Sequence, residues 1–270
     1  MSDTQIVKEF YNDNVMYEWE RMKRHPIEFE VTKHYLDKYI QSGDRVLDIG
    51  GGPGRYSFYL AEKGCDVTLF DLSEGNIAFV KRKAHELNLK INTVQGDARE
   101  VDQLVCGNFD HVLLMGPMYH LLDEQDRVKA MNAALKLLKP GGIIFVSFIS
   151  LYAGFSYFLS EDPQGVLNSS EQEYICCFLA NETFCGTAFT RACFIAPQEI
   201  LPFMERFSLE KLHFFGQESI TSPAEKNICA CEQDVVKCWV KIAIQTCERE
   251  EFLPYSAHLM YVGRYRGEVE

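Results

Sequence analysis

The stretch Arg45-Val-Leu-Asp-Ile-Gly-Gly-Gly-Pro-Gly-Arg-Tyr-Ser57 decides the fold, because a short apolar run meets an acid and then four glycines in five positions. It predicts a strand that turns tightly into a helix, since a helical spacing of apolar residues resumes over residues 55–63. Glycine suits such a turn because its backbone takes conformations that a Cβ forbids and lets a ligand approach closely. The stretch therefore predicts a nucleotide-type binding site.

The spacing of the glycines separates two kinds of nucleotide site. A dinucleotide site has Gly-x-Gly-x-x-Gly facing a pyrophosphate. Counted from Gly50 or Gly52, the third glycine would fall on Arg55 or Ser57. The sequence instead has Asp48 followed by glycine at every second position from 50 to 54. Asp48 would repel an anion and attract a cationic amino group, so the pattern disfavours a pyrophosphate.

This pattern resembles the first motif of the class I S-adenosylmethionine (SAM) methyltransferases, whose cofactor carries a sulfonium and an ammonium in place of a pyrophosphate. Later segments are similar to further motifs of the family: the strand ending in Asp71, the strand and loop ending in Asp97-Ala98, the fourth strand with its loop 115–121, and Leu138-Lys-Pro-Gly-Gly142. The resemblance covers about residues 40–149 and implies SAM as methyl donor and S-adenosylhomocysteine (SAH) as product.

The donor site is predicted at the ends of these strands. A carboxylate at the end of the second strand, Asp71, can accept hydrogen bonds from both ribose hydroxyls. The alternative is that Asp71 caps the following helix, but Ser73 and Glu74 already supply that cap. The resemblance implies that the loop at 97–98 binds the adenine edge, and that an N-terminal helix contacts the cofactor carboxylate through Tyr11, Arg21 or Arg24. The predicted cofactor-binding residues are Asp48, Gly50, Gly51, Gly52, Gly54, Asp71, Leu72, Asp97, Ala98, Met115, Tyr11 and Arg24.

The acceptor is predicted to lie beyond the fourth strand, at Met115-Gly-Pro-Met-Tyr-His120. This loop lacks the Asn/Asp-Pro-Pro-Tyr signature of enzymes that methylate exocyclic amines, and Gly116 has no side chain to accept amine protons. His120 and Tyr119 are the candidate catalytic residues, because the pKa of histidine suits a proton acceptor near neutral pH. The alternative is a structural His120 that caps the next helix or lines the pocket.

The fold class expected is α/β. Five strands separated by helices predict a parallel sheet, and strands near 208–215 and 256–266 follow. The resemblance implies a Rossmann-like, doubly wound seven-stranded sheet in the order 3-2-1-4-5-7-6, with the last strand antiparallel beside the fifth. The expected parts are a helical cap (1–40, with breaks at 12–14 and Pro26), a SAM-binding core (41–149), an acceptor lid (150–196) and the C-terminal part of the same domain (197–270).

Two further segments carry structural predictions. Residues 150–196 are rich in aromatic residues without a clear period, and we expect them to form aromatic walls over a small acceptor. A separate satellite core under a long excursion is the alternative. A helix near 232–249 should bury Val235, Trp239, Ile242 and Ile244.

Composition narrows the partners. Hydrophobic residues at 47% and charged residues at 24% are ordinary for a soluble protein. The formal charge of −12 gives no global basic surface for nucleic acid, so no nucleic-acid partner is expected. We find neither a signal peptide nor an apolar run long enough to span a bilayer. A cytoplasmic monomer or homodimer without a membrane partner is predicted.

The ten cysteines show no regular ligand spacing. A zinc site from Cys229, Cys231, Cys238 and Cys247 is disfavoured by irregular spacing and the lack of a nearby histidine. No metal is expected, and buried reduced thiols are the favoured interpretation.

The predicted function is methyl transfer from SAM to a small-molecule acceptor by direct displacement at the sulfonium methyl. Two alternatives share the donor motifs: a SAM-binding regulator without turnover, and a protein or RNA methyltransferase. An NAD-dependent dehydrogenase is disfavoured, because Arg55 replaces the third glycine and Asp48 precedes the turn.

Overall fold

The computed structural model describes residues 1–267, apart from the side chain of Met22. Its sheet contains nine strands: β1 (Arg45–Ile49), β2 (Asp66–Asp71), β3 (Ile91–Gln95), β4 (Phe109–Leu114), β5 (Leu138–Ser150), β6 (Phe184–Thr187), β7 (Arg191–Ile195), β8 (Leu209–Gly216) and β9 (His258–Tyr265). The first five pair in parallel in the order β3-β2-β1-β4-β5, with β9 antiparallel to β5 and β8 antiparallel to β9. With β8 as sixth and β9 as seventh strand, the predicted α/β Rossmann-like order is confirmed.

A small hairpin extends the sheet beyond the predicted strands. β7 pairs in parallel with the last two residues of β5, and β6 pairs antiparallel with β7. β9 pairs with one edge of β5 as far as Ile149, and β4 pairs with the other edge only up to Leu114. β7 therefore pairs with the part of that second edge that lies beyond the end of β4. The sequence prediction missed this hairpin, since residues 150–196 show no clear alternation.

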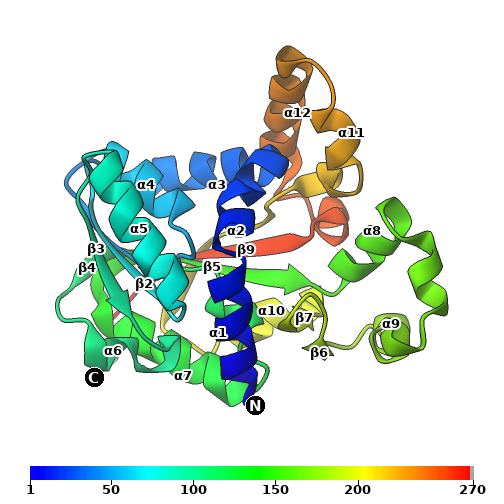
Figure 1. The fold of residues 1–270 in the computed structure, drawn as a ribbon, viewed down its shortest axis with the longest axis horizontal. Helices are drawn as coiled ribbons and strands as arrows, with labels where there is room; N and C mark the ends of the chain where they lie inside the picture. The colour runs from blue at the N-terminus through cyan, green and yellow to red at the C-terminus, as the bar shows by residue number, and fades with distance from the viewer. Residues whose placement is uncertain (268–270) are drawn as a thin grey trace.

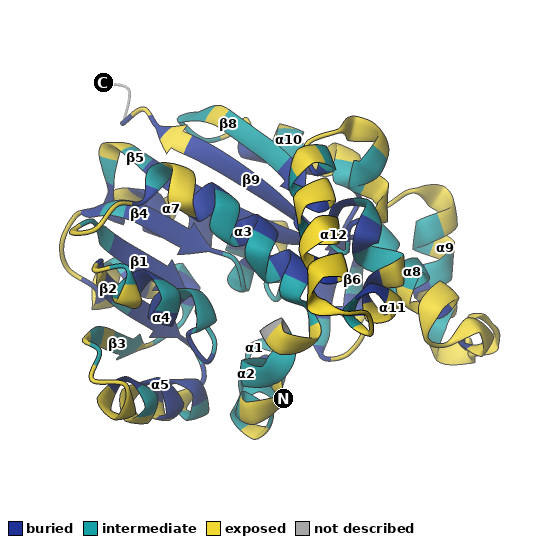
Figure 2. Cartoon of the chain, turned by 90° about the horizontal axis from the view of Figure 1, so that it is seen from above, coloured by how far each residue is buried: buried dark blue, intermediate teal, exposed yellow. Residues whose placement is uncertain are grey.

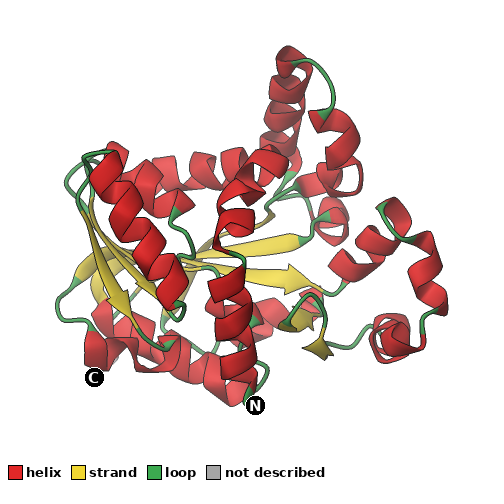
Figure 3. Cartoon of the chain, viewed as in Figure 1, coloured by secondary structure: helices red, strands yellow, loops and turns green. Residues whose placement is uncertain are grey.

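Helices cover both faces of the sheet, as Figure 1 and Figure 3 show. One face packs on α3 (Pro26–Tyr39), α4 (Arg55–Glu62), α5 (Glu74–Glu86) and α12 (Gln233–Thr246). The other packs on α6 (Val101–Leu104), α7 (Glu124–Leu137) and α10 (Pro197–Met204). Neighbouring residues of β4 alternate between these two cores, as the pleat requires, and Figure 2 shows the strands as the buried middle layer.

Two N-terminal helices, α1 (Asp3–Asp13) and α2 (Val15–Arg24), lie at the carboxyl ends of the strands and lead into α3 on one face of the sheet. The predicted breaks are confirmed at Asn14 and just before Pro26. Asn14 stands at the start of α2 without a side-chain capping bond, whereas the Asn12 carboxamide oxygen accepts from Ser73 Oγ (2.7 Å) and the Gly75 amide (3.1 Å). Asn12 therefore fastens α1 to the start of α5.

The aromatic rings of residues 150–196 pack on one another. The segment contains α8 (Tyr152–Ser160), α9 (Gln172–Ala180) and the β6–β7 hairpin, and Figure 1 shows α8 and α9 beyond the ends of β5 and β7. Phe155 and Phe178 stack with centroids 3.6 Å apart, and Tyr174 contacts Phe158, Phe184 and Phe194. They form a satellite core, which was the alternative to aromatic walls over an acceptor.

Two other predictions are wrong in part. Val235, Trp239 and Ile242 lie on the exposed face of α12, because this helix buries Val236 and Ala243 instead; Ile244 does pack against the core. Cys185 and Cys193 form a disulfide across the β6–β7 pair and are not reduced thiols. The division of the chain into four parts stays a prediction, although α3 ends at Tyr39 and β7 at Ile195.

Across residues 1–267, no helix combines the length and the apolar character that crossing a membrane requires.

Candidate active site

A cleft opens over the carboxyl ends of the parallel strands, beside the switch in strand order between β1 and its neighbours β2 and β4. Residues from these strand ends form its floor, while α1 and α2 contribute side chains from above. The predicted residues that line it are Asp48, Gly50, Gly51, Gly52, Asp71, Leu72, Asp97, Ala98, Met115, Tyr11, Tyr119 and His120. The topology thus gathers side chains that are far apart in the sequence.

The glycine turn needs glycine for two different reasons. Gly50 has φ +71°, and a Cβ there would lie only 2.4 Å from Cδ of Pro117 in the loop after β4. A Cβ on Gly51 would lie 2.7 Å from Oδ2 of Asp48. Gly52, with φ +57°, has open space where its Cβ would be. The absent side chains at 50 and 51 thus permit close packing, while Gly52 leaves the cleft floor open.

Asp48 places a buried carboxyl beneath this turn. Its side chain is 2% exposed and accepts a hydrogen bond from Ser57 Oγ at 2.7 Å. Burial raises the pKa of Asp48 to about 7, against the effect of the Ser57 bond, and the nearby Asp71 carboxylate adds to the rise. A cationic group bound here would favour the ionised carboxylate, so the site suits an ammonium.

Asp71 is anchored more extensively than the sequence indicates. Its Oδ2 accepts from the Gly52 amide at 2.8 Å, and its Oδ1 accepts from the Ser73 amide at 2.8 Å and from Asn76 Nδ2 at 3.1 Å. Ser73 itself caps α5, as expected. Burial raises the pKa of Asp71 despite these bonds. The carboxylate therefore fixes the glycine turn to the end of β2 while it lines the cleft.

Asp97 and Ala98 also line the cleft, but the Asp97 carboxylate has a partner that sequence reasoning missed. Arg99 donates to Asp97 through its backbone amide (3.0 Å) and its guanidinium (3.0 and 2.5 Å), and also pairs with Asp126 at 2.6 Å. This bridge ties the loop after β3 to the first turn of α7. No spacing rule marks Arg99 as part of the site.

Two predicted cofactor residues lie outside the cleft lining. Gly54 begins α4 with φ +87° behind the turn. Arg24 is exposed, with its guanidinium 3.9 Å from the ring centroid of Tyr17 and a bond to the Tyr17 carbonyl at 2.9 Å. Of the two arginines that the sequence offered, Arg21 lines the cleft and Arg24 does not, and the cofactor roles of Gly54 and Arg24 stay predictions.

His120 has both ring nitrogens engaged within the protein. Its Nδ1 lies 2.9 Å from the Arg191 carbonyl, which can only accept, so Nδ1 carries the proton. Nε2 then accepts from the Tyr11 hydroxyl at 2.6 Å. Burial lowers the pKa of His120 to about 4. Its lone pair is therefore occupied, and the ring joins α1 to the β6–β7 hairpin.

His120 does not cap the next helix, because the Asp123 side chain caps α7, but it does line the cleft. Tyr119 lines the cleft, and burial raises the pKa of its hydroxyl well above the ordinary tyrosine value. Tyr119 is thus a neutral donor or acceptor at physiological pH.

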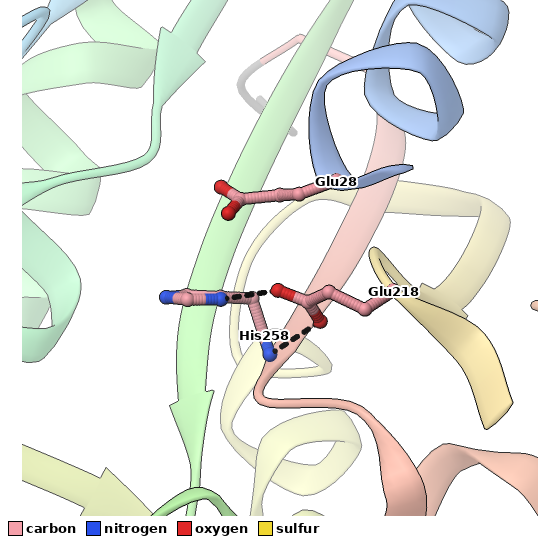
Figure 4. Close-up of side chains that lie close together, drawn as sticks. All are labelled: Glu28, Glu218 and His258. Atoms are coloured by element: carbon pink, nitrogen blue, oxygen red, sulfur yellow. Dashed lines mark hydrogen bonds and ion pairs between the residues drawn. The ribbon is translucent and has the colours of Figure 1, made fainter. Parts of the chain in front are cut away.

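A charged cluster that sequence reasoning missed also contributes to the cleft, since Arg21, Glu28 and His258 line it. Glu28 of α3, Glu218 after β8 and His258 at the start of β9 each bring a side-chain nitrogen or oxygen within 4.8 Å of the others (Figure 4). His258 Nδ1 and Glu218 Oε1 are 2.6 Å apart. Arg21 of α2 donates to both oxygens of Glu28, at 2.9 and 2.7 Å, and lies 3.4 Å from His258 Nε2. The sheet and two helices assemble this cluster.

Arg21 supplies a positive charge within this cluster. Glu28, Glu218 and His258 are the one group of metal-type ligands found among the described residues. The guanidinium already supplies the positive charge opposite Glu28. The four cysteines considered for zinc do not gather: Cys231 and Cys238 are exposed, while Cys247 is buried against Tyr35.

Comparison with known proteins assigns the core of this site. Residues 46–142 match the family model described as a methyltransferase domain. These residues form a class I methyltransferase domain. Ubiquinone biosynthesis O-methyltransferase of Cronobacter sakazakii is 28% identical over 182 residues, covering 64% of this chain and 65% of that protein. Glycine/sarcosine N-methyltransferase of Parasynechococcus marenigrum is 29% identical over 147 residues, covering 53% and 52%.

Solved structures share the fold of the methyltransferase domain and its surroundings. Magnesium protoporphyrin IX methyltransferase from Synechocystis, solved with bound SAH, aligns with a TM-score of 0.60 over 98% of this chain and all of that chain, at 14% identity. The [4+2]-cyclase SpnF aligns with a TM-score of 0.56 over 88% and 81%, at 17% identity. The chain spans less than two thirds of the length of the curated relatives named above.

The methyltransferase domain accounts for one half of the cleft. The glycine turn, Asp71 and Asp97 all belong to residues 46–142. The residues of the charged cluster lie outside that range, because Arg21 and Glu28 precede it and Glu218 and His258 follow it. Helices and C-terminal strands outside the matched range therefore provide the Arg21–His258 cluster.

Proposed function

We propose that this chain transfers a methyl group from SAM to a small-molecule acceptor, with SAH as the product. The observation that carries the proposal is one continuous cleft that is lined both by the glycine turn of the methyltransferase domain and by the Arg21–His258 cluster. The residues around the glycine turn have the groups that a SAM molecule needs, and the cluster offers polar side chains to an acceptor.

The residues at the donor end fit SAM. Asp48 offers a buried carboxyl to the ammonium, and the open floor at Gly52 leaves room for the ligand. Asp71 offers its carboxylate to the ribose hydroxyls, and Leu72 with Ala98 offers apolar surface to the adenine. The bound cofactor supplies a methyl group that its sulfonium already activates. The chain then mainly has to align the acceptor, and such alignment is worth roughly 7–11 kcal/mol in model reactions.

A small molecule is the favoured acceptor because the cleft is lined by more acids than bases. Its charged lining consists of Glu18, Glu28, Asp48, Asp71 and Asp97 against Lys8, Arg21 and Arg55. Together with the formal charge of −12, this disfavours a phosphate backbone as substrate. The names of the two curated relatives, which specify ubiquinone biosynthesis and glycine or sarcosine, support the same class.

The fold alone does not require methyl transfer, since a [4+2]-cyclase shares it. The test is incubation of the chain with methyl-labelled SAM and separate small-molecule, RNA and protein fractions of a cell extract. Label in the small-molecule fraction with release of SAH supports the proposal. Label in RNA or protein would favour the macromolecular alternative, and binding of SAM without any SAH formation would favour a regulator.

We expect SAM affinity to fall as the pH is lowered below 7. Binding the ammonium favours ionised Asp48, whose pKa in the free chain is about 7, so below that pH binding must displace a proton. The affinity should drop by up to about tenfold per pH unit. Calorimetric titration with SAH between pH 5 and 7.5 measures it. Asp48→Asn should bind SAH with an affinity that does not depend on pH in this range. Adenosine, which lacks the ammonium, should bind the native chain without this dependence. If the affinity of Asp48→Asn still falls with pH, Asp48 is not the group that binds the ammonium.

A further inference from the structure

We infer that His258, held by Glu218, is the general base that removes the proton from a phenolic or enolic hydroxyl of the acceptor, and that Arg21 stabilises the resulting oxyanion. The inference rests on the proposed methyl transfer and names the acceptor class for the same cleft. It replaces His120, whose two ring nitrogens are bonded within the protein, as the proton acceptor.

Glu218 fixes the proton of the His258 ring. Its carboxylate is buried and receives three hydrogen bonds: from His258 Nδ1 at 2.6 Å, from the His258 amide at 3.0 Å and from Ser256 Oγ at 3.0 Å. Burial alone would raise the pKa of Glu218, but its contacts with His258 lower it below the ordinary value. An ionised carboxylate only accepts, so Nδ1 carries the proton and Nε2 keeps its lone pair.

Nε2 of His258 faces a positive charge in the cleft. The charged and titratable groups around the ring are Glu218, Arg21 of α2, Glu28 of α3 and Tyr119 after β4, whose ring centroid lies 6.3 Å away. Arg21 makes its short bonds to Glu28 and only a long one, 3.4 Å, to Nε2. Nε2 therefore has no short bond to give up when a substrate hydroxyl approaches.

Arg21 keeps its charge in this position. Burial alone would lower the pKa of its guanidinium, but the Glu28 carboxylate raises it above the ordinary arginine value. A fixed guanidinium close to an oxygen that loses its proton stabilises the developing negative charge. His258 and Arg21 together therefore offer a base and an oxyanion partner at one place.

The pair suits a phenol or enol better than an amine or an alkanol. A neutral amine attacks without losing a proton first, so it needs no base. A phenol has a pKa near 10, about 3.5 units above an ordinary histidine, and Arg21 narrows that difference. A water-like hydroxyl has a pKa near 15.7, which is too far from histidine for efficient transfer.

The step balances as follows. The O–H bond of the acceptor breaks, and the proton goes to Nε2 of His258. A lone pair of that oxygen forms the new bond to the methyl carbon, while the carbon–sulfur bond breaks and leaves its electron pair on sulfur. The positive charge of the sulfonium is lost as one appears on the imidazolium. The products are a methyl ether and SAH.

The chain offers a matched control for the His258–Glu218 pair. His213 and Glu248 form the same kind of pair, with Nδ1 2.9 Å from a carboxylate oxygen. The His213 Nε2 is bonded to the Tyr39 hydroxyl at 2.7 Å, and neither member of the pair lines the cleft. A change at His213 therefore removes a comparable pair without touching the proposed site.

The test titrates SAH-loaded chain with para-nitrophenol, whose phenolate has a visible absorption band. We expect the native chain and His213→Asn to bind it as phenolate at a pH where the free compound is protonated. His258→Asn keeps an amide donor for Glu218 but lacks Nε2, so its bound phenolate fraction should fall at least tenfold. An unchanged phenolate band in His258→Asn, or no binding of para-nitrophenol to the SAH-loaded native chain, would overturn the inference.

Calorimetry with SAH separates this outcome from a failure of the proposed function. If the native chain does not bind SAH, methyl transfer itself is wrong. If SAH binds and para-nitrophenol is not ionised, only the role of His258 is wrong.

Glu218 is a positioning residue and has its own readout. In chain labelled with nitrogen-15 histidine, we expect the His258 ring protonated at Nδ1 in the native protein and in Glu218→Asp. Glu218→Gln can donate to Nδ1, so it should move the proton to Nε2 and lower the phenolate fraction at least tenfold, with partial recovery in Glu218→Asp. An unchanged tautomer and phenolate fraction in Glu218→Gln would contradict the positioning role, whereas a merely structural role would change only stability.

Discussion

Gly50→Ala is expected to destabilise the fold by about 2–5 kcal/mol and to abolish detectable SAM binding. An alanine at φ +71° costs roughly 1–2 kcal/mol. Its Cβ would also lie 2.4 Å from Cδ of the rigid Pro117 ring, and such overpacking costs about 1–3 kcal/mol. Relief of this clash must move the glycine turn away from the loop after β4. Chemical denaturation and calorimetry measure the two effects.

Gly43→Ala is the matched control for Gly50→Ala. Gly43 has φ +93°, but its Cβ would have nothing within 4 Å, and it lies outside the cleft. We expect the free energy of unfolding of Gly43→Ala to fall only by the cost of the left-handed backbone conformation, about 1–2 kcal/mol. This variant should bind SAM normally. Equal stability of the two variants would show that the close approach to Pro117 does not constrain the turn.

Asp71→Asn is expected to weaken SAM binding by about ten- to a hundredfold. A hydrogen bond to a charged group contributes roughly 1.5–3 kcal/mol, and about 1.4 kcal/mol corresponds to a factor of ten. The free energy of unfolding should also fall by about 1–3 kcal/mol. The reason is that the Asn side chain has one acceptor oxygen in place of two, so it cannot accept all three hydrogen bonds from Gly52 N–H, Ser73 N–H and Asn76 Nδ2. Calorimetry at a temperature where the variant is folded measures the affinity.

Asp44→Asn serves as the control for Asp71→Asn. The Asp44 carboxylate also accepts from a backbone amide, that of Gln41 at 2.7 Å, but it does not line the SAM cleft. This variant should lose some stability and keep its SAM affinity. If folded Asp71→Asn bound SAM as tightly as the native chain, Asp71 would be structural and would not bind the ribose.

The donor half of the cleft could be predicted because each of its parts is local in sequence. Asp48 and Gly50 are two residues apart, and Asp71 ends a recognisable buried strand. Parallel strands bring their carboxyl ends to one edge, so the end of a strand is enough to place a side chain near the cofactor. The local pattern of alternating strands and helices predicts the parallel sheet, whereas the order of β1 to β5 is implied by the resemblance to the methyltransferase family.

The acceptor half could not be predicted because its residues meet only through tertiary structure. His258 reaches the cleft because β9 pairs antiparallel with β5, and Glu28 because it lies in the first turn of α3, directly after α2. Neither residue stands in a motif. Arg21 and Arg24 are one helical turn apart, and only the stacking of Arg24 on Tyr17 separates their roles. The aromatic content of residues 150–196 likewise does not predict whether the rings line the cleft or pack on one another.

Parallel calorimetric titration of the purified chain with SAM, SAH and NAD tests the central claim most directly. The account predicts saturable binding of SAM and SAH and no binding of NAD, because Asp48 and the spacing of Gly50, Gly52 and Gly54 suit an ammonium and exclude a pyrophosphate. Binding of NAD with no binding of SAM or SAH would contradict the account.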